Sequence, residues 1–307
     1  MGYRTKTLSR TAHSRGKRFR PALALLLAKA YGAEKKVFDA ALAIELFHNF
    51  SLIHDDIADK DELRRGNPTL WKLWGINHAL NAGDAQIFLS NQFVLSAARI
   101  PKVGQTLSVA LSESFLQVCE GQYLDFELGD THIEEIRHPK EQYLEMARKK
   151  TGALIGVSAQ VAGFAAGKSR KECEVLRRFG ESLGVAYQIA DDYRSIWGKD
   201  TGKDMYGDIR ERKRSLPLLF AVNDSNARTS YRLRDVLNLN RRLADLEVIE
   251  VLGLVDATHA KVRTLESLKL HAAEAARLIS LLSVSLTTKK KLLGLLNTLI
   301  PEALSDT

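Results

Sequence analysis

Two short acidic clusters each lie within an apolar run of helical character, and this placement constrains the fold more than any other feature of the sequence. The first cluster spans residues 55–59 and the second is Asp191 with Asp192. Neighbouring carboxylates in apolar surroundings repel each other and lose hydration, so they need a cation to remain ionised. Carboxylate oxygens suit Mg²⁺, which proteins usually hold together with substrate phosphates. Because basic residues follow both clusters, the pattern indicates a diphosphate site.

The composition is that of an ordinary folded protein with an excess of positive charge. Of the 307 residues, 45% are hydrophobic and 27% are charged, and the formal net charge is +8. The basic residues are spread along the chain without a patterned basic face, which favours an anionic small molecule over nucleic acid as the partner. The first twenty residues are basic and polar, and the apolar run 21–30 is far too short to cross a bilayer. We therefore expect a cytoplasmic protein with no membrane span and no nucleic-acid partner.

Helical periodicity dominates the chain, and no alternating strand pattern or strand–helix repeat is present. Few prolines and abundant Leu and Ala favour the same all-α class. Residues 65–69 are expected to form a turn and residues 198–215 a polar loop. The expected helices are 22–31, 38–57, 79–98, 106–128, 139–166, 176–196 and 216–222, with short helices from about residue 233. With no repeat or linker, the sequence predicts one all-α domain over 1–307. Cys119 and Cys173 show no metal-binding or redox spacing, and we expect buried free thiols.

The first acidic cluster would lie at the end of a long apolar helix. Asp55 and Asp59 are one helical turn apart and share a face, Asp56 flanks them, and His48 lies two turns back on nearly the same stripe. Carboxylates at the end of a buried helix usually face a cavity. The alternative interpretation is a solvated acidic helix end.

Two basic segments accompany this cluster. Arg64 and Arg65 follow it directly and could either pair with its carboxylates or clamp phosphate oxygens in the forked geometry that Arg prefers. The basic segment 16–21 precedes an apolar helix, and is either an anion site or a solvated tail.

The second cluster has its own polar neighbours. Gln188 lies one turn before Asp191 and Asp192, and Lys150 with Thr151 comes from another expected helix. Taken singly, the lysines are ordinary surface residues, but beside the aspartates they suit a diphosphate. Further basic residues lie in the polar loop: Lys199, Lys203, Lys213 and Arg214.

Taken together, these residues resemble the trans-polyprenyl diphosphate synthases, the family of farnesyl and geranylgeranyl diphosphate synthases. The resemblance covers nearly the whole chain and keeps the family's order and spacing. The matching segments are 16–21, 48–59, 64–66, Gln122 with Asp125, Lys150 with Thr151, 188–192, and 198–217.

The resemblance implies a single-domain bundle of long helices around a central cavity, the isoprenoid synthase fold, usually paired as a homodimer. It also implies a reaction: an allylic diphosphate condenses head-to-tail with isopentenyl diphosphate to give a short-chain prenyl diphosphate. A C20 product is favoured, and C15 is next.

Roles for individual residues follow from the same resemblance. Asp55, Asp59 and Asp191 would hold three Mg²⁺ ions, with Asp56 and Asp192 as supporting carboxylates. The residues expected to neutralise the allylic diphosphate are Arg64, Lys150, Lys199 and Lys213. Those expected to hold the diphosphate of isopentenyl diphosphate are Lys17, Arg20, His48 and Arg65. Thr151 and Gln188 would stabilise the allylic cation.

Two departures from the family pattern are present. Ser195 stands where the second motif often has a third aspartate, so we expect fewer carboxylates there with activity retained. Only fifteen residues precede Gly16, whereas relatives commonly have one or two more helices, so we expect an N-terminal truncation.

Product length is expected to depend on the helix before the first cluster. Phe47 and Phe50 lie one to two turns before Asp55, and a ring at Phe50 should stop chain growth early. The small Ser51 beside it leaves more room than a second adjacent ring would. The alternative is that both rings only pack against neighbouring helices.

Two other functions share part of this pattern. A class I terpene cyclase fits Asp191, Asp192 and Ser195, but has a glutamate where this chain has Lys199, and it lacks a site for isopentenyl diphosphate. A non-catalytic subunit of a heteromeric synthase tends to lose the acidic or basic residues that are retained here.

Overall fold

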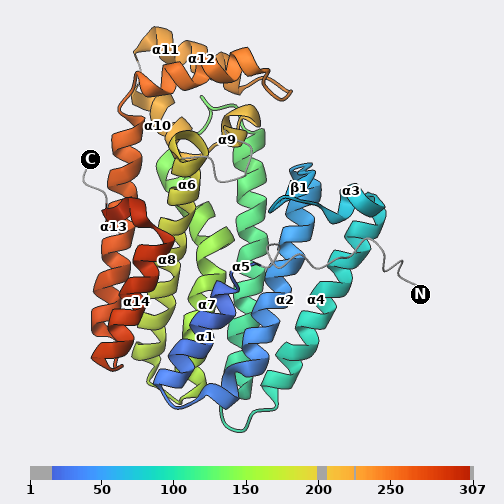
Figure 1. Ribbon diagram of the computed structural model, residues 1–307, viewed down its shortest axis with the longest axis vertical. Helices are drawn as coiled ribbons and strands as arrows, with labels where there is room; N and C mark the ends of the chain where they lie inside the picture. The colour runs from blue at the N-terminus through green and yellow to red at the C-terminus, as the bar shows by residue number, and fades with distance from the viewer. Residues whose placement is uncertain (1–15, 199–205, 225, 305–307) are drawn as a thin grey trace.

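The computed structural model describes residues 16–198, 206–224 and 226–304, and these residues are almost entirely helical, as predicted (Figure 1). The N-terminal helices are α1 (Phe19–Ala30), α2 (Glu34–Ala58), α3 (Leu70–Trp74), α4 (Ile76–Ala98) and α5 (Gly104–Asp130). The middle of the chain forms α6 (Pro139–Ala147), the π-helical turn η3 (Arg148–Gly152), α7 (Ala153–Ala165) and α8 (Arg170–Trp197). The remainder forms α9 (Gly207–Arg210), α10 (Leu216–Asp224), α11 (Ala227–Leu237), α12 (Asp245–Asp256), α13 (Ala260–Leu281), α14 (Leu286–Leu299) and η4 (Pro301–Leu304).

The long predicted helices are confirmed, but two local predictions were incomplete. The expected helix 139–166 is interrupted by the π-helical turn η3, which separates α6 from α7. The expected turn at 65–69 lies within a small antiparallel hairpin of β1 (Leu63–Arg64) and β2 (Asn67–Pro68). Both strands are too short to give a periodic signal. Within the expected polar loop, α9 forms a single helical turn.

The core of the bundle is built around α7, which is buried along most of its length and packs against α1, α2, α5 and α8. Its apolar sequence covers the whole circumference, as expected for a helix enclosed by others. Where the chain enters α7, glycines let it approach α8 closely: a Cβ on Gly184 would lie 2.5 Å from the Cα of Gly152. This close approach holds the residues beside Gly152 against the middle of α8.

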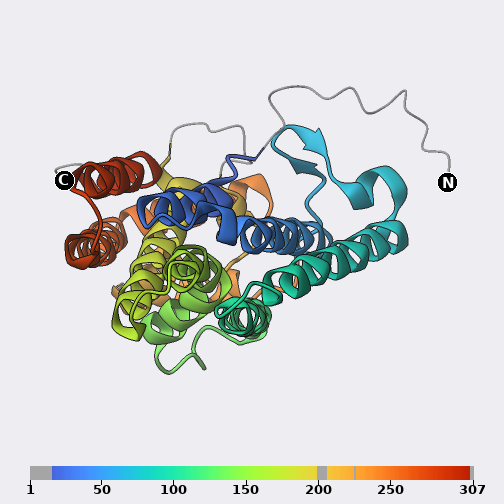
Figure 2. The same ribbon diagram turned by 90° about the horizontal axis from the view of Figure 1, so that it is seen from below.

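The C-terminal ends of α2 and α8 lie at the same end of the bundle, together with β1, α9 and the start of α6 (Figure 1). The two acidic clusters are therefore brought to one end of the molecule. Figure 2 shows α4 and α14 on opposite sides of the bundle. Among the described helices, none combines the length and apolarity that a bilayer crossing demands. The cysteine prediction was half right, because Cys173 is buried but Cys119 is exposed.

Candidate active site

The first acidic cluster occupies the last turn of α2. Asp56 is only 6% exposed and accepts a hydrogen bond of 2.5 Å at Oδ1 from Nε of Arg64, which β1 supplies. Burial raises the pKa of Asp55, Lys150 and Arg64 lower it, and Asp59 raises it further. Asp59 caps the end of the helix. Of the two interpretations proposed for Arg64, the structure shows pairing with a carboxylate of this cluster. The cluster is therefore not a freely solvated helix end.

Lys150 enters the same acidic group from the π-helical turn. Its Nζ donates to Oδ2 of Asp125 on α5 at 2.5 Å. Burial alone would lower the pKa of Lys150, but Asp125 and Asp55 outweigh burial and raise it. The backbone at Lys150 lies directly against Gly121 of α5, where any side chain would collide with it. Asp125 was part of the family match but had no assigned role, and the structure places it among the charged residues of the site.

The second acidic cluster lies in the last third of α8. Asp192 is buried and accepts hydrogen bonds from Nε2 of Gln188 at 3.0 Å and from the backbone N–H of Leu216 at 3.2 Å. Burial, and then the charge of Asp208, raises the pKa of Asp192 to about 7. Asp191 is half-buried beside it. The pKa of Arg194 is raised, mainly by its hydrogen bond to Glu302 and to a smaller extent by the charge of Asp191.

Two sets of contacts involve the clusters. In the first, the Thr151 hydroxyl donates to Oε1 of Gln188 at 2.8 Å, and Gln188 donates in turn to Asp192. In the second, Nζ of Lys213 lies 3.3 Å from Oδ2 of Asp59. Burial lowers the pKa of Lys213, but Asp59 and Asp208 outweigh it and raise the pKa. Since the charge of Asp208 also raises the pKa of Asp192, the acidic residues of α2 and α8 belong to one charged region.

Ser195, which replaces an expected aspartate, is bonded to another carboxylate. Its hydroxyl lies 2.6 Å from Oδ2 of Asp208 on α9 and 2.8 Å from the backbone oxygen of Asp192. Sequence reasoning missed Asp208 because nothing in its local pattern distinguishes it from other loop aspartates. Lys199 lies outside the described residues, so its expected role remains a prediction.

A separate basic group lies beside the middle of α2, around His48. Nη1 of Arg20 donates to Nε2 of His48 at 3.1 Å. Burial, followed by the charges of Arg20 and Arg65, lowers the pKa of His48 to about 2, so this imidazole is neutral. The guanidinium of Arg65 packs against Gly16, next to the exposed Lys17. Of the four residues predicted to bind one diphosphate, Arg20, His48 and Arg65 are therefore brought together by α1, α2 and the hairpin, and Lys17 lies just before α1.

The same basic group contains an unsatisfied donor and one acid. The buried Nε of Arg20 has no hydrogen-bond partner among the residues that the structure describes. A buried guanidinium N–H without a partner is costly, and an anionic ligand would satisfy it. Glu45 on α2 also lies here. Burial raises its pKa, while Arg20, Arg18 and Arg65 lower it. Sequence reasoning missed Glu45.

The three residues expected to set product length differ in their surroundings. Phe47 is 1% exposed and stacks on Phe115 with ring centroids 4.0 Å apart. Phe50 is half-buried and contacts the rings of Phe47 and His54 at 5.4 and 4.6 Å. The Ser51 hydroxyl donates to the backbone oxygen of His48 at 2.9 Å. Phe50 is therefore the more accessible ring, whereas Phe47 belongs to the core.

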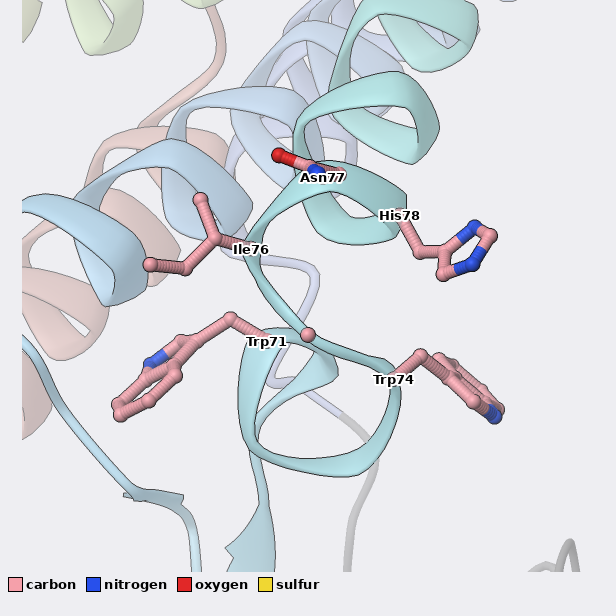
Figure 3. Close-up of a pocket in the computed structure, with 6 residues that line it drawn as sticks. Trp71, Trp74, Ile76, Asn77 and His78 are labelled. Atoms are coloured by element: carbon pink, nitrogen blue, oxygen red, sulfur yellow. The ribbon is translucent and has the colours of Figure 1, made fainter.

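A pocket of about 430 Å³ lies at the junction of α3 and α4 (Figure 3). It is lined by Trp71, Trp74, Gly75, Ile76, Asn77 and His78. Trp71 is fixed by a hydrogen bond of 2.8 Å from its indole N–H to the backbone oxygen of Asp61. Neither acidic cluster contributes to this pocket.

The donor set near the clusters fits a hard divalent cation. The charges of Asp59 and Asp125 both raise the pKa of Asp55, and all three side chains offer only oxygen ligands. Within the described ranges, no group of three or more Asp, Glu, His or Cys side chains forms a ready-made metal cage. Carboxylate oxygens are the ligands that hard divalent cations prefer.

Comparison with known proteins shows which family the chain resembles in sequence. The family model described as "Polyprenyl synthetase" matches residues 3–254. A (2E,6E)-farnesyl diphosphate synthase of Mycobacterium bovis is 42% identical over 211 residues, which are 67% of this chain and 57% of that protein. The matched region thus spans little more than half of that relative.

Solved structures share the fold. A crystal structure of a geranylgeranyl pyrophosphate synthase has a TM-score of 0.85 and 32% identity, covering 94% of this chain and 88% of its own. A polyprenyl synthase from Caulobacter crescentus, complexed with calcium and isoprenyl diphosphate, has a TM-score of 0.82 and 25% identity, covering 96% and 86%. The chain therefore belongs to the polyprenyl synthetase family.

Proposed function

We propose that the chain is a trans-prenyltransferase that condenses an allylic diphosphate with isopentenyl diphosphate, head-to-tail, to a short-chain prenyl diphosphate. A C20 product is favoured and C15 is next. The observation that carries the proposal is the position of the two acidic clusters at one end of the bundle, where Lys213 pairs with Asp59 and Thr151 and Gln188 are hydrogen-bonded to each other and to Asp192. The names of the farnesyl and geranylgeranyl relatives support the same range of products.

The allylic diphosphate would bind between the two clusters. Mg²⁺, with three ions expected at Asp55, Asp59 and Asp191, would balance charge on the leaving diphosphate. Arg64, Lys150 and Lys213 surround the same region and would contact phosphate oxygens directly. Preorganised cations of this kind favour cleavage of the allylic C–O bond, because they stabilise the charge that develops on the leaving group.

The cationic carbon would lie near Thr151 and Gln188. Their oxygen atoms are held in place by the hydrogen bonds to each other and to Asp192, so they are preorganised acceptors for positive charge. Isopentenyl diphosphate would be held through its own diphosphate by Lys17, Arg20, His48 and Arg65. Its double bond forms the new C–C bond, and a proton then leaves to the released diphosphate.

We also propose that the chain functions as a homodimer through α4 and α5. Large apolar residues are exposed on these helices at seven-residue spacing, which keeps them on one stripe: Phe88 and Leu95 on α4, and Val109, Leu116 and Tyr123 on α5. Exposed apolar stripes of this size mark interaction surfaces. A second copy of the chain is the occupant that the family resemblance suggests.

The direct test is incubation of the purified protein with isopentenyl diphosphate, Mg²⁺ and either dimethylallyl or farnesyl diphosphate, followed by product analysis. We expect isopentenyl diphosphate to be consumed, with release of pyrophosphate and formation of a longer prenyl diphosphate. A terpene hydrocarbon made from the allylic substrate alone would indicate a cyclase. Turnover that requires a second, different chain would indicate a non-catalytic subunit.

The basic group around Arg20 favours the synthase over the cyclase. A cyclase has no need for a second diphosphate site, whereas an anionic ligand would satisfy the buried Nε of Arg20, which has no partner among the described residues. Replacing Arg20 should therefore raise the KM for isopentenyl diphosphate more than the KM for the allylic substrate.

A further inference from the structure

Each of three acidic residues in the candidate site is paired with a cationic side chain of the protein itself. Arg64 contacts Asp56 at 2.5 Å, Lys150 contacts Asp125 at 2.5 Å, and Lys213 contacts Asp59 at 3.3 Å. Carboxylates that are crowded together and partly dehydrated need this compensation to stay ionised. The protein therefore balances much of the negative charge of the site with its own side chains.

Lys213 differs from the other two cations in its contacts. Its side chain is 42% exposed, against 32% for Arg64 and 23% for Lys150. Its distance to its carboxylate is the longest of the three. In addition, its Nζ lies 3.6 Å from Oε2 of Glu211, two residues earlier in the chain, which is closer than the second carboxylate of Arg64, Asp61, at 3.9 Å. Lys213 can therefore leave Asp59 for Glu211 with little loss of charge pairing.

The backbone of Lys213 is held in place, while its side chain can reach either Asp59 or Glu211. Its N–H donates to the backbone oxygen of Asp208 at 2.9 Å, and the carboxylate of Asp208 is bonded to Ser195 of α8. Glu211 is itself fixed by Arg242 at 3.0 Å. The lysine is thus anchored to α8 through Asp208, and its ammonium group reaches across to α2.

We propose that Lys213 acts as an internal counter-cation of the first acidic cluster. Its ammonium group pairs with the carboxylate of Asp59 until a diphosphate binds. A lysine on Asp59 repels a divalent ion and competes for the same oxygen atoms. A bound diphosphate adds negative charge that attracts both the lysine and the metal. The same residue therefore opposes binding of metal alone and favours joint binding of metal and diphosphate. This inference rests on the proposed function. It adds that the metal binds together with the diphosphate and not before it.

The test measures metal binding without any isoprenoid. Free Mn²⁺ is titrated against the full-length protein and followed by electron paramagnetic resonance, first alone and then with inorganic pyrophosphate. The variants are Lys213→Gln and Lys213→Arg. The matched control is Lys72→Gln, which removes a lysine that pairs with the exposed Glu62 at 2.6 Å.

Without pyrophosphate, we expect the Lys213→Gln variant to bind Mn²⁺ at least about fivefold more tightly than the wild type does. A change of this size is at the lower end of the couplings measured between two binding sites. Lys213→Arg and Lys72→Gln should match the wild type. With pyrophosphate present, the order should reverse, and Lys213→Gln should bind Mn²⁺ more weakly. A merely structural ion pair would not produce this reversal. Equal or weaker binding of Mn²⁺ alone by a folded Lys213→Gln variant would overturn the proposal.

A second variant covers the case in which Lys213→Gln does not fold. Glu211→Gln removes the alternative partner of Lys213 and should hold the lysine on Asp59 more firmly. We therefore expect weaker binding of Mn²⁺ alone, the opposite sign to Lys213→Gln, and an unchanged affinity would contradict the proposal. Because no isoprenoid is used, this result is independent of the condensation assay that tests the proposed function.

Discussion

The hydroxyl of Thr151 donates a hydrogen bond of 2.8 Å to the side-chain oxygen of Gln188, joining the π-helical turn to α8. The amide N–H of Gln188 in turn donates a hydrogen bond to Asp192. The amide is thus fixed at both ends, so its oxygen has a defined direction. The bond depends on the close approach of Gly152 and Gly184, which brings the two backbones together.

Gln188→Ala should lower kcat by about 10-fold to 100-fold, because the variant loses an oriented acceptor near the developing cation. The KM for isopentenyl diphosphate should change little, since Gln188 is not part of the basic group around Arg20. Steady-state kinetics with both substrates varied will separate the two parameters. Gln142→Ala, at an exposed position on α6, is the control. A raised KM at unchanged kcat would contradict the assigned role.

Phe50 and Phe47 should respond differently to replacement by alanine. Phe50→Ala should lengthen the prenyl product, because the half-buried ring no longer limits chain growth. Phe47→Ala should instead destabilise the protein by about 3–5 kcal/mol, since it removes a fully buried ring stacked on Phe115. Chromatography of the products and urea unfolding will measure the two effects. An unchanged product distribution for Phe50→Ala would show that its ring only packs against its neighbours.

The positions of these residues show how far sequence reasoning extends. The helices that carry Asp55 and Asp191 were predictable because apolar periodicity is a local signal. The π-helical turn was not, because it depends on the contacts of Lys150 with Gly121 on α5 and of Gly152 with Gly184 on α8. Whether a helix tightens or widens at one turn is decided by such tertiary packing.

The candidate site was predictable where a motif concentrates the functional groups. Arg64 lies against Asp56 of the first cluster, and Arg20 lies against His48 in the separate basic group, so residues expected at one site are close together in the fold. The bond between Ser195 and Asp208 was not predictable, since Asp208 lies thirteen residues away in a segment with no periodic pattern. The role of Asp125 was also missed, because a lone carboxylate on a helix is most often a surface residue.

Asp192→Asn should stabilise the protein at high pH in the absence of divalent metal. The pKa of Asp192 in the folded protein is raised to about 7, above the value of about 3.9 for an unfolded aspartate. The folded state therefore binds this proton more tightly. Its contribution to stability is complete below about pH 4 and is lost as the pH rises through about 7.

Urea unfolding in EDTA at pH values from 5 to 8 will measure this effect. The free energy of unfolding of Asp192→Asn should exceed that of the wild type by an amount that grows with pH, reaching about 2–4 kcal/mol. Asp130→Asn, at an exposed position, should show no such trend. A difference that is independent of pH would contradict the raised pKa.

Leu116→Glu combined with Phe88→Glu should convert a homodimer into monomers. Both side chains are highly exposed in the single chain, at 61% and 69%, and a charge on each would prevent burial against a second copy. Leu246→Glu, which alters an 81% exposed residue on α12, should leave the oligomeric state unchanged. Light scattering coupled to size-exclusion chromatography gives the mass directly. Wild-type protein that is monomeric would refute the proposed interface.

The central claim is that carboxylates of α2 and α8 act on one bound diphosphate. The most direct measurement is anomalous scattering from a crystal grown with Mn²⁺ and inorganic pyrophosphate. We expect peaks that touch both Asp55 with Asp59 and Asp191, with the pyrophosphate between them. Peaks confined to one cluster, or pyrophosphate bound away from both, would contradict the account.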